Sequence, residues 1–521
     1  MLHVKKRSLN WALKHALRFG DTDVFPSQFE FDAIKHDWAR ISAFLLGEDI
    51  HNWKTRPLRS LLSPKSRYGF RIITQLDPLD FLVFAALVYE IGEDLENKRV
   101  PVADNVVFSH RFRPDTDGRM YDRAVGYNEF QTRAKRKAAA STCTHVAVTD
   151  IADFYPRIYS HRLENALRDC TNKTAHVTAV RKLLEGWNET ESHGIPVGSA
   201  PSRLLAELTI SDVDEALIAH GINYIRYSDD YRLFCTSYSE AFRQLALLAQ
   251  ILYENHGLTL QPQKTTIYTA NNFRRVFVSS PEDKELDELR ERFAALLDEL
   301  GLSDPYEEIN YDDLTTEQRE IVDSLNLQGL FLVEVDKHDP DLSILRFVLR
   351  RLGQLGDNCS IETIFDKIEV LHPVFPEIIK YFINLRYLYS KPKADLAERL
   401  LSLLNDSIVG ELPFFRMWTF SLFTRSREWD NEGRFLQLLN NSNDQFSRRE
   451  LMLAMGRAHH RHWFQSQWRH LFDEASWPRR ALLAAASCLP GDARNHWYRS
   501  VSPRLDVLEK AVVSWAKENP F

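Results

Sequence analysis

Apolar and polar residues follow two different patterns along the chain. In the first half, the alternating stretch Thr144 to Asp150 (THVAVTD) predicts a strand that ends in an acid. The stretch Tyr224 to Cys235 (YIRYSDDYRLFC) predicts a β-hairpin with a polar Ser-Asp-Asp tip. Apolar residues at helical spacing predict helices over 8–46, with a break in the GDTDVFP segment, and over 80–90.

From about residue 283 the pattern becomes helical and stays helical. The segment DKELDELRERFAALLDEL places a row of apolar side chains on one helical face: Leu286, Leu289, Phe293, Leu296, Leu297 and Leu300. Further helices are expected over 341–355, 360–389, 394–424, 433–440, 447–472, 478–488 and 502–517. Without a strict period, paired helices in an α-solenoid-like array are the expected packing. The pattern therefore predicts two domains, residues 1–280 and 281–521.

Composition narrows the class of protein. The chain has 521 residues, 44% of them hydrophobic, which is enough for more than one packed core. No apolar stretch of ~18 residues occurs and the N-terminus is too polar for a signal peptide, so we expect a cytoplasmic protein without a membrane partner. The five cysteines form no CxxC pair, so neither a disulfide framework nor a cysteine zinc site is predicted.

Charged residues are distributed unevenly along the chain, whose net charge is −7. Residues 51–75 contain six Lys or Arg and no acid, with aromatic residues between them. Such a stretch is commonly a solvated basic loop, but the interleaved aromatic rings favour contact with nucleic acid or nucleotides. The second half of the chain is acidic, which argues against broad non-specific DNA binding there.

The hairpin tip carries Asp229 and Asp230 side by side. Two carboxylates at ~4 Å repel by about 4 kcal/mol at an effective dielectric of ~20, so a fold that adds a third, such as Asp150, needs a cation. Mg²⁺ is the usual one, because carboxylates and phosphates are its preferred ligands. On its own, an Asp pair in a turn is more often solvated turn chemistry.

Two further segments have both a structural and a functional interpretation. The Gly194 to Ser202 loop precedes an apolar helix, and its small residues would let a nucleotide approach the backbone, but taken alone the loop is better explained as a simple capped helix start. Lys264, in GLTLQPQK, could reach a phosphate or be a surface lysine. His459 and His462 would share a helical face, and packing histidines explain them better than a zinc site.

The order and spacing of DIADFYP, GIPVGSAPSRLLAE, YSDD and GLTLQPQK resemble motifs A to D of reverse transcriptase palms. The basic stretch at 51–75 is similar to the fingers strands that cover an incoming nucleotide. The GDTDVFP segment, the form of motif B and the long helical region resemble bacterial abortive-infection and defence-associated reverse transcriptases. The resemblance implies an α+β fold with right-hand fingers and palm, followed by an all-α helical-repeat domain.

The resemblance also implies roles for single residues. Asp150, Asp229 and Asp230 would be catalytic and would hold two Mg²⁺ ions, with the Ile151 backbone as a further metal ligand. Tyr155 matches the steric gate that excludes a ribose 2′-hydroxyl. Nucleotide contacts are also implied for Lys65, Arg71 and Lys264, the last as a proton donor to pyrophosphate.

The implied activity is DNA synthesis from dNTPs, either RNA-directed or template-independent, in antiphage defence. Partners would be the DNA product, an RNA that serves as template or associated non-coding RNA, and further copies of this chain. Val197 replaces the usual motif B glutamine and Arg203 the usual final proline, which puts conventional template use in doubt. The resemblance to the abortive-infection group, together with Val197, implies protein-primed synthesis as a further expectation, with an ordinary nucleic-acid primer as its alternative. The alternative is a non-catalytic nucleic-acid-binding scaffold with a palm fold.

Overall fold

The computed structural model describes residues 1–22, 24–188, 191–277, 314–324, 326–385, 393–429 and 432–521, together with residue 295. The chain forms two compact units, each assembled from separate stretches of sequence. The first comprises 1–23, 39–60 and 74–285, and the second comprises 24–38, 61–73 and 286–521. Two stretches from the N-terminal part of the sequence thus belong to the second unit. The division into domains at residue 280 stays a prediction.

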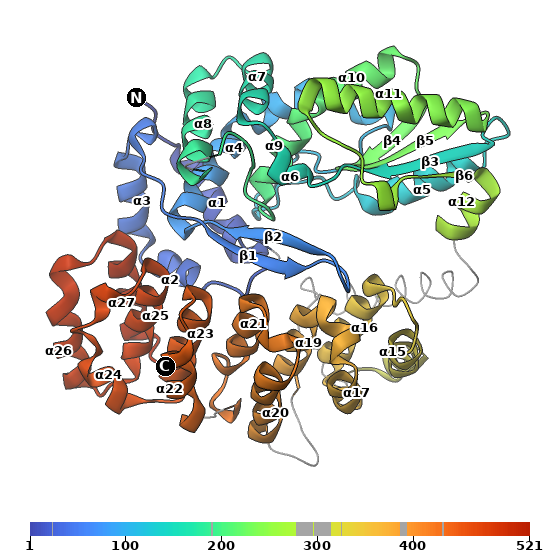
Figure 1. The fold of residues 1–521 in the computed structure, drawn as a ribbon. Coiled ribbons are helices and arrows are strands. Elements are labelled where there is room, and N and C mark those ends of the chain that lie inside the picture. The colour runs from blue at the N-terminus through green and yellow to red at the C-terminus, as the bar shows by residue number, and fades with distance from the viewer. Residues whose placement is uncertain are drawn as a thin grey trace. The chain divides into compact units, whose positions relative to one another are not determined.

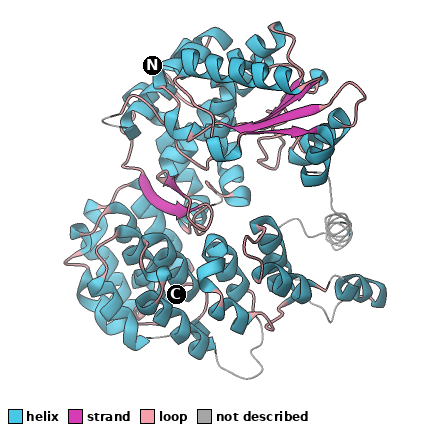
Figure 2. Cartoon of the chain, turned by 45° about the vertical axis from the view of Figure 1, so that its right-hand side comes forward, coloured by secondary structure: helices cyan, strands magenta, loops and turns pink. Residues whose placement is uncertain are grey.

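The first unit contains a four-stranded antiparallel sheet (Figure 1). Its strands are β3 (His145–Asp150), β4 (Tyr224–Tyr227), β5 (Asp230–Cys235) and β6 (Thr266–Thr269), in the order β4-β5-β3-β6. The strand predicted to end at Asp150 and the predicted hairpin are both confirmed. Within the described residues, the only other sheet is the pair β1 (Arg59–Pro64) and β2 (Phe70–Gln75) (Figure 2).

Helices cover both faces of the four-stranded sheet. Successive side chains of a strand point to opposite faces, so the strands pack against helices on both sides. Val146, Val148 and Phe234 point to the face on which α5 and α12 pack (Figure 1). Helix α11 packs on the other face, and its core-facing residues include Leu248 and Leu252. Because both faces are buried, the register of β3 against β5 is strongly specified.

Helix α4 (Pro78–Lys98) forms much of the rest of the first core. Asp77 caps it by accepting a hydrogen bond from the Leu79 amide, and Pro78 occupies the first turn. The helix predicted at 80–90 is therefore confirmed and longer than expected. The other helices of this unit are α1 (Lys6–Phe19), α3 (Trp38–Gly47), α5 (Tyr127–Ala138), α6 (Phe154–Arg157), α7 (Ser160–Cys170), α8 (Thr174–Asn188), α9 (Ala200–Thr209), α10 (Ser211–Ala219), α11 (Tyr238–His256) and α12 (Ala270–Phe277).

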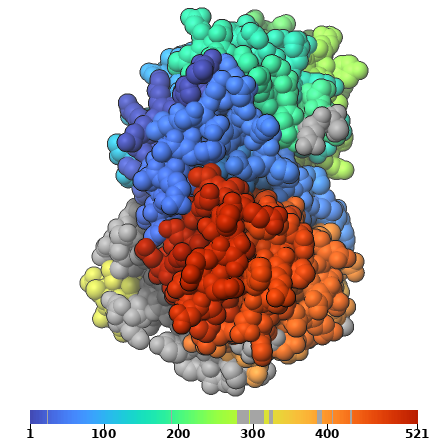
Figure 3. Space-filling view, turned by 90° about the vertical axis from the view of Figure 1, so that its left-hand side faces the viewer, coloured from blue at the N-terminus to red at the C-terminus, as the bar shows by residue number. Residues whose placement is uncertain are grey.

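The second unit is mainly helical, and its C-terminal helices pack closely in the space-filling view (Figure 3, orange to red). Its helices are α2 (Glu30–His36), α14 (Thr316–Ser324), α15 (Leu327–Val335), α16 (Leu342–Leu355), α17 (Ile361–Asp366), α18 (Ile368–Leu371), α19 (Phe375–Ile383), α20 (Lys393–Asp406), α21 (Pro413–Phe423), α22 (Glu432–Asn441), α23 (Gln445–Arg457), α24 (Arg461–Gln467), α25 (Ser476–Ala485), α26 (Gly491–Val501) and α27 (Val507–Glu518). Across the described ranges, no helix combines the length and apolar character needed to cross a membrane.

A buried ion cluster joins the N-terminal segment of the second unit to its C-terminal helices. Glu30 in α2 is fully buried, accepts a hydrogen bond from Arg449 at 2.6 Å and lies 3.4 Å from Arg480. Phe25, Ala33, Leu61 and Ile73 belong to the same hydrophobic core as the C-terminal helices. The second unit is thus incomplete without residues that precede position 74.

Three predicted helices are divided in the structure. The stretch 360–389 breaks into α17, α18 and α19, at Lys367 and again at the turn that contains Pro373, whose missing backbone donor favours the second break. The stretch 394–424 breaks before Pro413. The stretch 447–472 breaks because His459 adopts a left-handed conformation, φ 59°, so His459 and His462 do not share a helical face, contrary to the prediction. Apart from residue 295, the helix predicted at 283–300 lies outside the described residues.

Candidate active site

Strand pairing brings the two halves of the predicted acidic site together. Asp150, the last residue of β3, lies directly opposite Asp230, the first residue of β5. Facing residues of antiparallel strands have Cβ atoms roughly 4.5–5.5 Å apart. Asp229 precedes Asp230 in the hairpin turn, so the sheet gathers all three predicted acids at one edge.

Backbone contacts hold this edge in place. Ser228 is buried in the turn in a left-handed conformation, φ 54°. The Ile151 amide donates to the carbonyl oxygen of Asp229 at 3.0 Å, and the Gln261 amide donates to the Asp150 carbonyl at 2.7 Å. The predicted metal-binding backbone of Ile151 therefore lies beside the hairpin tip.

The charges at this edge act on one another. Burial, together with the nearby carboxylates of Asp150 and Asp229, raises the pKa of Asp230 to about 6, against the opposing effects of Arg232 and Lys264. Carboxylates that raise one another's pKa are a suitable ligand set for a hard divalent cation. The donor set therefore fits the metal that the sequence predicts.

In the structure, Lys264 supplies the cation at this edge. Its ammonium group forms an ion pair with the Asp150 carboxylate. Within the described ranges, no three His, Cys, Asp or Glu side chains already converge on one point as metal ligands do. Metal binding would therefore require the Lys264 ammonium to leave Asp150.

Tyr155 lies next to the hairpin tip. It belongs to α6, which begins after Asp153 adopts a left-handed conformation, φ 47°. Burial raises its pKa, its hydroxyl contacts the Ser228 side chain, and the charge of Asp229 adds to the rise. The tyrosine is thus close to the acidic edge, where a gate residue has to be.

The motif B loop is fixed to the fold at two points. The Val197 amide donates to the Thr74 hydroxyl oxygen at 2.6 Å, and Gly198 has φ 106°, a conformation that favours glycine. Ser199 then caps α9 by accepting from the Ser202 amide. The segment is a capped helix start, as the structural interpretation predicts. It is also a loop beside Tyr155, because the Tyr155 carbonyl accepts a hydrogen bond from the Ile195 amide, so the interpretation as a nucleotide-contacting loop is equally compatible with the structure.

A buried ionic network behind the hairpin was not found from the sequence. Arg226 in β4 donates to both oxygens of Asp214 and to Glu207 at 2.7 Å. Glu207, in α9, also accepts from Arg99 at 2.8 Å, and Arg226 donates to the Ser228 carbonyl at 3.2 Å. All four charged side chains are buried. The network therefore ties the motif B helix to the turn that carries Asp229. Its ion-paired members are 12 or more positions apart in the sequence, so no local pattern indicated it.

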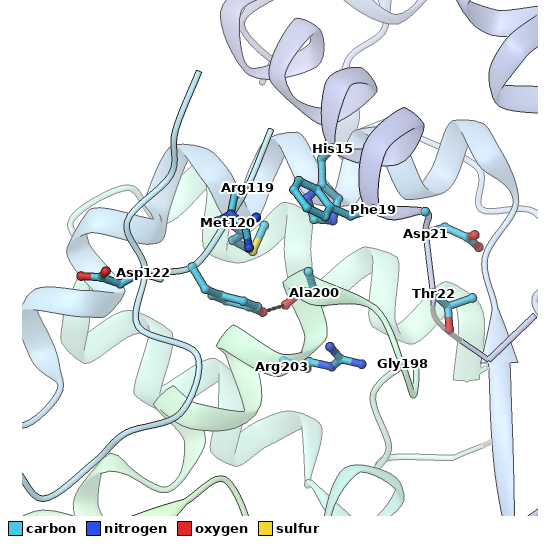
Figure 4. A pocket seen from close by; sticks show the side chains of 12 residues that line it. His15, Phe19, Asp21, Thr22, Arg119, Met120, Asp122, Gly198, Ala200 and Arg203 are labelled. Carbon is cyan, nitrogen blue, oxygen red and sulfur yellow. Dashed lines mark hydrogen bonds between the residues drawn. The ribbon is translucent and has the colours of Figure 1, made fainter. Parts of the chain in front are cut away.

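A cavity of about 190 Å³ adjoins the motif B loop (Figure 4). Its walls include Arg203, Arg119 and the Gly198 backbone, with His15 and Phe19 close together on one side. The Tyr121 hydroxyl donates to the Ala200 carbonyl here. Burial lowers the pKa of His15 to about 4, so this histidine is neutral at pH 7. The sequence identified Arg203 only as a departure from a motif, and gave no sign of His15.

Lys65 and Arg71 lie in or beside the β1–β2 hairpin, in the part that belongs to the second unit, and both are exposed. Asp150, Asp229, Asp230, Tyr155 and Lys264 belong to the first unit. The triphosphate contacts expected of Lys65 and Arg71 stay a prediction.

Residues 104–310 match the family model described as "Reverse transcriptase (RNA-dependent DNA polymerase)". This part of the chain is a reverse transcriptase domain. It contains the acidic edge, Tyr155, the motif B loop and Lys264, and it makes the protein a DNA nucleotidyltransferase of the RNA-directed polymerase type. Reverse transcriptase domains work with divalent metal ions.

The solved structures that this chain matches include two telomerases. Apo telomerase from Candida tropicalis is 12% identical, with 74% of this chain and 73% of that chain covered and a TM-score of 0.33. Telomerase from Candida albicans in complex with a TWJ fragment of telomeric RNA is 11% identical, with 79% and 71% covered and a TM-score of 0.34. Scores this low do not establish a common fold. A comparison with curated protein sequences finds no match.

Proposed function

We propose that the reverse transcriptase domain adds dNTPs to a growing DNA by two-metal nucleotidyl transfer. The observation that carries the proposal is the pairing of Asp150 with Asp230 across β3 and β5, with Asp229 in the adjoining turn. These carboxylates and the Ile151 backbone would hold two Mg²⁺ ions. When bound, such ions activate the attacking hydroxyl and neutralise charge on the phosphates.

The other residues position and select the nucleotide. The Tyr155 ring, next to Ser228 and Asp229, would meet a ribose 2′-hydroxyl and so favour deoxynucleotides. Lys264, once released from Asp150, would carry a proton on Nζ toward the departing pyrophosphate. Lys65 and Arg71 would bind the triphosphate.

Template use is the second part of the proposal. Val197 has no side-chain amide to align a template base, and its backbone is held by Thr74. Synthesis would therefore be either RNA-directed or template-independent. The RNA partner would be a template or an associated non-coding RNA.

The cellular role we propose is antiphage defence of the abortive-infection type, in an assembly of several copies of this chain. The proposal is supported by the resemblance of GDTDVFP and GIPVGSAPSRLLAE to those of defence-associated reverse transcriptases. The helices of the second unit would form a solenoid-like array. Mass measurement in solution tests the assembly, and phage plaque counts with and without the protein test the role.

Incubation of purified protein with Mg²⁺ and each labelled dNTP or rNTP, with and without copurified RNA, tests the activity. We expect incorporation of dNTPs only, and a dependence on RNA would identify RNA-directed synthesis. If the protein binds nucleic acid but incorporates no nucleotide under any condition, the non-catalytic scaffold is correct and the polymerase proposal is wrong.

Protein priming is proposed as the way synthesis begins. A tyrosine or serine hydroxyl would take the place of the primer 3′-hydroxyl near Asp150, attack the α-phosphorus and release pyrophosphate. Labelled product would then migrate with protein after boiling in detergent and shift to free DNA after protease treatment. Product that runs entirely as free DNA before protease treatment would show an ordinary nucleic-acid primer.

A further inference from the structure

A cavity of about 270 Å³ lies wholly within the second unit. Its walls come from the segment around α2, the end of α21, α23 and α27, which are separate in sequence (Figure 1). Ligand cavities in proteins measure roughly 300–1,000 Å³, so a cavity of this size suits one small ligand rather than a nucleic-acid segment.

Two arginines face the cavity without a carboxylate partner. Arg425 follows α21 and is exposed, and in the part of the chain that the structure describes its guanidinium forms no hydrogen bond or ion pair with the protein. Arg457 ends α23, donates from Nε to the Thr424 carbonyl at 3.2 Å and lies over the Phe521 ring at 4.6 Å. Its remaining donors are directed to no acid among the described residues.

The charges of these two arginines affect each other. The protein around Arg425 withdraws part of its guanidinium from water and lowers its pKa, which the charge of Glu450 only partly offsets. Burial and the charge of Arg425 both lower the pKa of Arg457. An anion between the two guanidiniums would relieve this repulsion.

A third arginine that lines the same cavity differs from these two, because it has carboxylate partners. Arg449 donates to Glu30 at 2.6 Å and is also paired with Glu450. Its charge is therefore neutralised within the protein. Among the described residues, Arg425 and Arg457 are the arginines of this cavity that form no ion pair with a carboxylate.

Other walls of the cavity are aromatic and acidic. The rings of Phe29 and Trp515 are stacked, with centroids 5.5 Å apart and planes 24° from parallel. Asp32 is exposed at the rim of the cavity, and the protein around it withdraws part of its carboxyl group from water and raises its pKa. Aromatic rings provide a surface for a planar base, and a carboxylate accepts hydrogen bonds from sugar hydroxyl or base amino groups.

We propose that this cavity binds a nucleoside monophosphate, with the phosphate between Arg425 and Arg457, the base against Phe29 and Trp515, and Asp32 as hydrogen-bond acceptor. The nucleotide would be free, or it would be the phosphorylated end of a nucleic-acid strand. This site is additional to the proposed polymerase site, because none of its residues belongs to the reverse transcriptase domain.

Binding of the eight ribo- and deoxyribonucleoside monophosphates to the full-length protein by calorimetry, in EDTA, tests the proposal. We expect at least one to bind, and its nucleoside and inorganic phosphate alone to bind at least about tenfold more weakly. Arg425→Gln together with Arg457→Gln should weaken binding about ten- to a hundredfold, the loss expected for charge-assisted hydrogen bonds. The single variant Arg425→Gln, which removes no hydrogen bond of the protein, and Asp32→Asn should each weaken binding in a folded protein.

The control variant is Arg499→Gln, an exposed arginine of α26, which should bind as the parent does. Asp229→Asn with Asp230→Asn should also leave this binding unchanged, and loss of binding there would assign the ligand to the polymerase site instead.

Unchanged affinity in the arginine variants, absence of binding at millimolar nucleotide, or equal affinity for inorganic phosphate would each overturn the proposal. A 5′-phosphorylated oligonucleotide that binds more tightly than the monophosphate would identify a strand end as the natural ligand, and weaker binding would identify a free nucleotide.

Discussion

The carboxyl group of Asp230 belongs to the proposed metal-binding set, and its charged form destabilises the folded protein. Its pKa is raised to about 6, which means that the folded protein favours the protonated form more than the unfolded chain does. The charged form at pH 8 therefore costs folding free energy of about 3 kcal/mol. A fold that retains such a cost at a strand end is typical of a functional site.

The first prediction concerns this acidic edge. Asp229→Asn with Asp230→Asn should reduce nucleotide incorporation to background, because it removes metal-binding charge. It should also make the protein at least as stable as the parent at pH 8, since it removes the buried negative charge. Because the folded-state pKa of Asp230 lies above its ordinary value, the stability difference should shrink as the pH falls from about 6 to about 4. Thermal unfolding at several pH values measures the stability, and a primer-extension assay measures the incorporation. Near-normal incorporation by the folded variant would contradict the two-metal assignment.

The second prediction concerns the choice of sugar. Tyr155→Val should raise the ratio of rNTP to dNTP incorporation by about tenfold or more, because it removes the ring that would meet the 2′-hydroxyl. Tyr155→Phe is the matched control, since it keeps the ring and loses only the contact with Ser228. The ratio of kcat/KM values is the measurement. An unchanged ratio in the valine variant would place the gate at another residue.

At the scale of elements, the motif B helix and the hairpin are joined by charge rather than by apolar packing alone. Glu207 on α9 and Asp214 on α10 hold Arg226 on β4, two residues before Ser228. The Arg226 and Arg99 guanidiniums hold the pKa of Glu207 at about 2, although burial by itself would raise it. The position of Asp229 thus depends on a pair of helices that carry no catalytic group.

Glu207→Gln should therefore destabilise the protein by about 3–5 kcal/mol, because it leaves buried arginine charge without its partner. In the parent, the folded pKa of Glu207 lies below its ordinary value of 4.5, so its contribution is present above pH 4.5 and is lost as the pH falls towards about 2. The variant should lose less stability on acidification over that range. Denaturant unfolding between pH 3 and pH 7 measures this.

Glu215→Gln is the control for the network. Glu215 forms an exposed ion pair with Lys98 at 3.1 Å, so its loss should cost less than about 1 kcal/mol. Equal effects of the two substitutions would show that the Glu207 network does not stabilise the fold.

At the scale of the whole molecule, the second unit takes core residues from the N-terminal part of the chain. Glu30 is buried against Arg449 and Arg480, and Leu61 and Ile73 pack in the same core as the C-terminal helices. Removal of those helices would expose the apolar and charged partners left behind. We therefore expect that removing the C-terminal half of the sequence also destabilises the N-terminal half.

Deletion of residues 281–521 should accordingly abolish polymerisation and protection from phage, and the fragment should aggregate or unfold at lower temperature. Glu30→Gln is the matched point variant, which should lower the stability of the second unit by about 3–5 kcal/mol by leaving buried arginine charge unpaired. Thermal unfolding, primer extension and plaque counts are the measurements. A 1–280 fragment that retains full polymerisation and full protection would contradict the prediction.

The sequence by itself determined the elements of the acidic edge. Alternation in THVAVTD predicted β3 and its terminal Asp150, and the apolar runs around Ser228 predicted the hairpin, because both signals are local. The helical character of the C-terminal region was equally visible, although prolines and the left-handed His459 divided its helices where the apolar pattern continued. Motif order then identified the reverse transcriptase domain.

Only the tertiary structure decided which distant residues meet. Lys264 on Asp150, Arg226 between Glu207 and Asp214, and Glu30 against Arg449 are pairings between charges that lie far apart in the sequence. Burial turns such charges into specific partners, because an unpaired charge in the interior is costly, and burial depends on the packing of elements that are remote along the chain. The same dependence explains why the arginine cavity of the second unit left no signal in the sequence, since its walls meet only after α2 packs against α27.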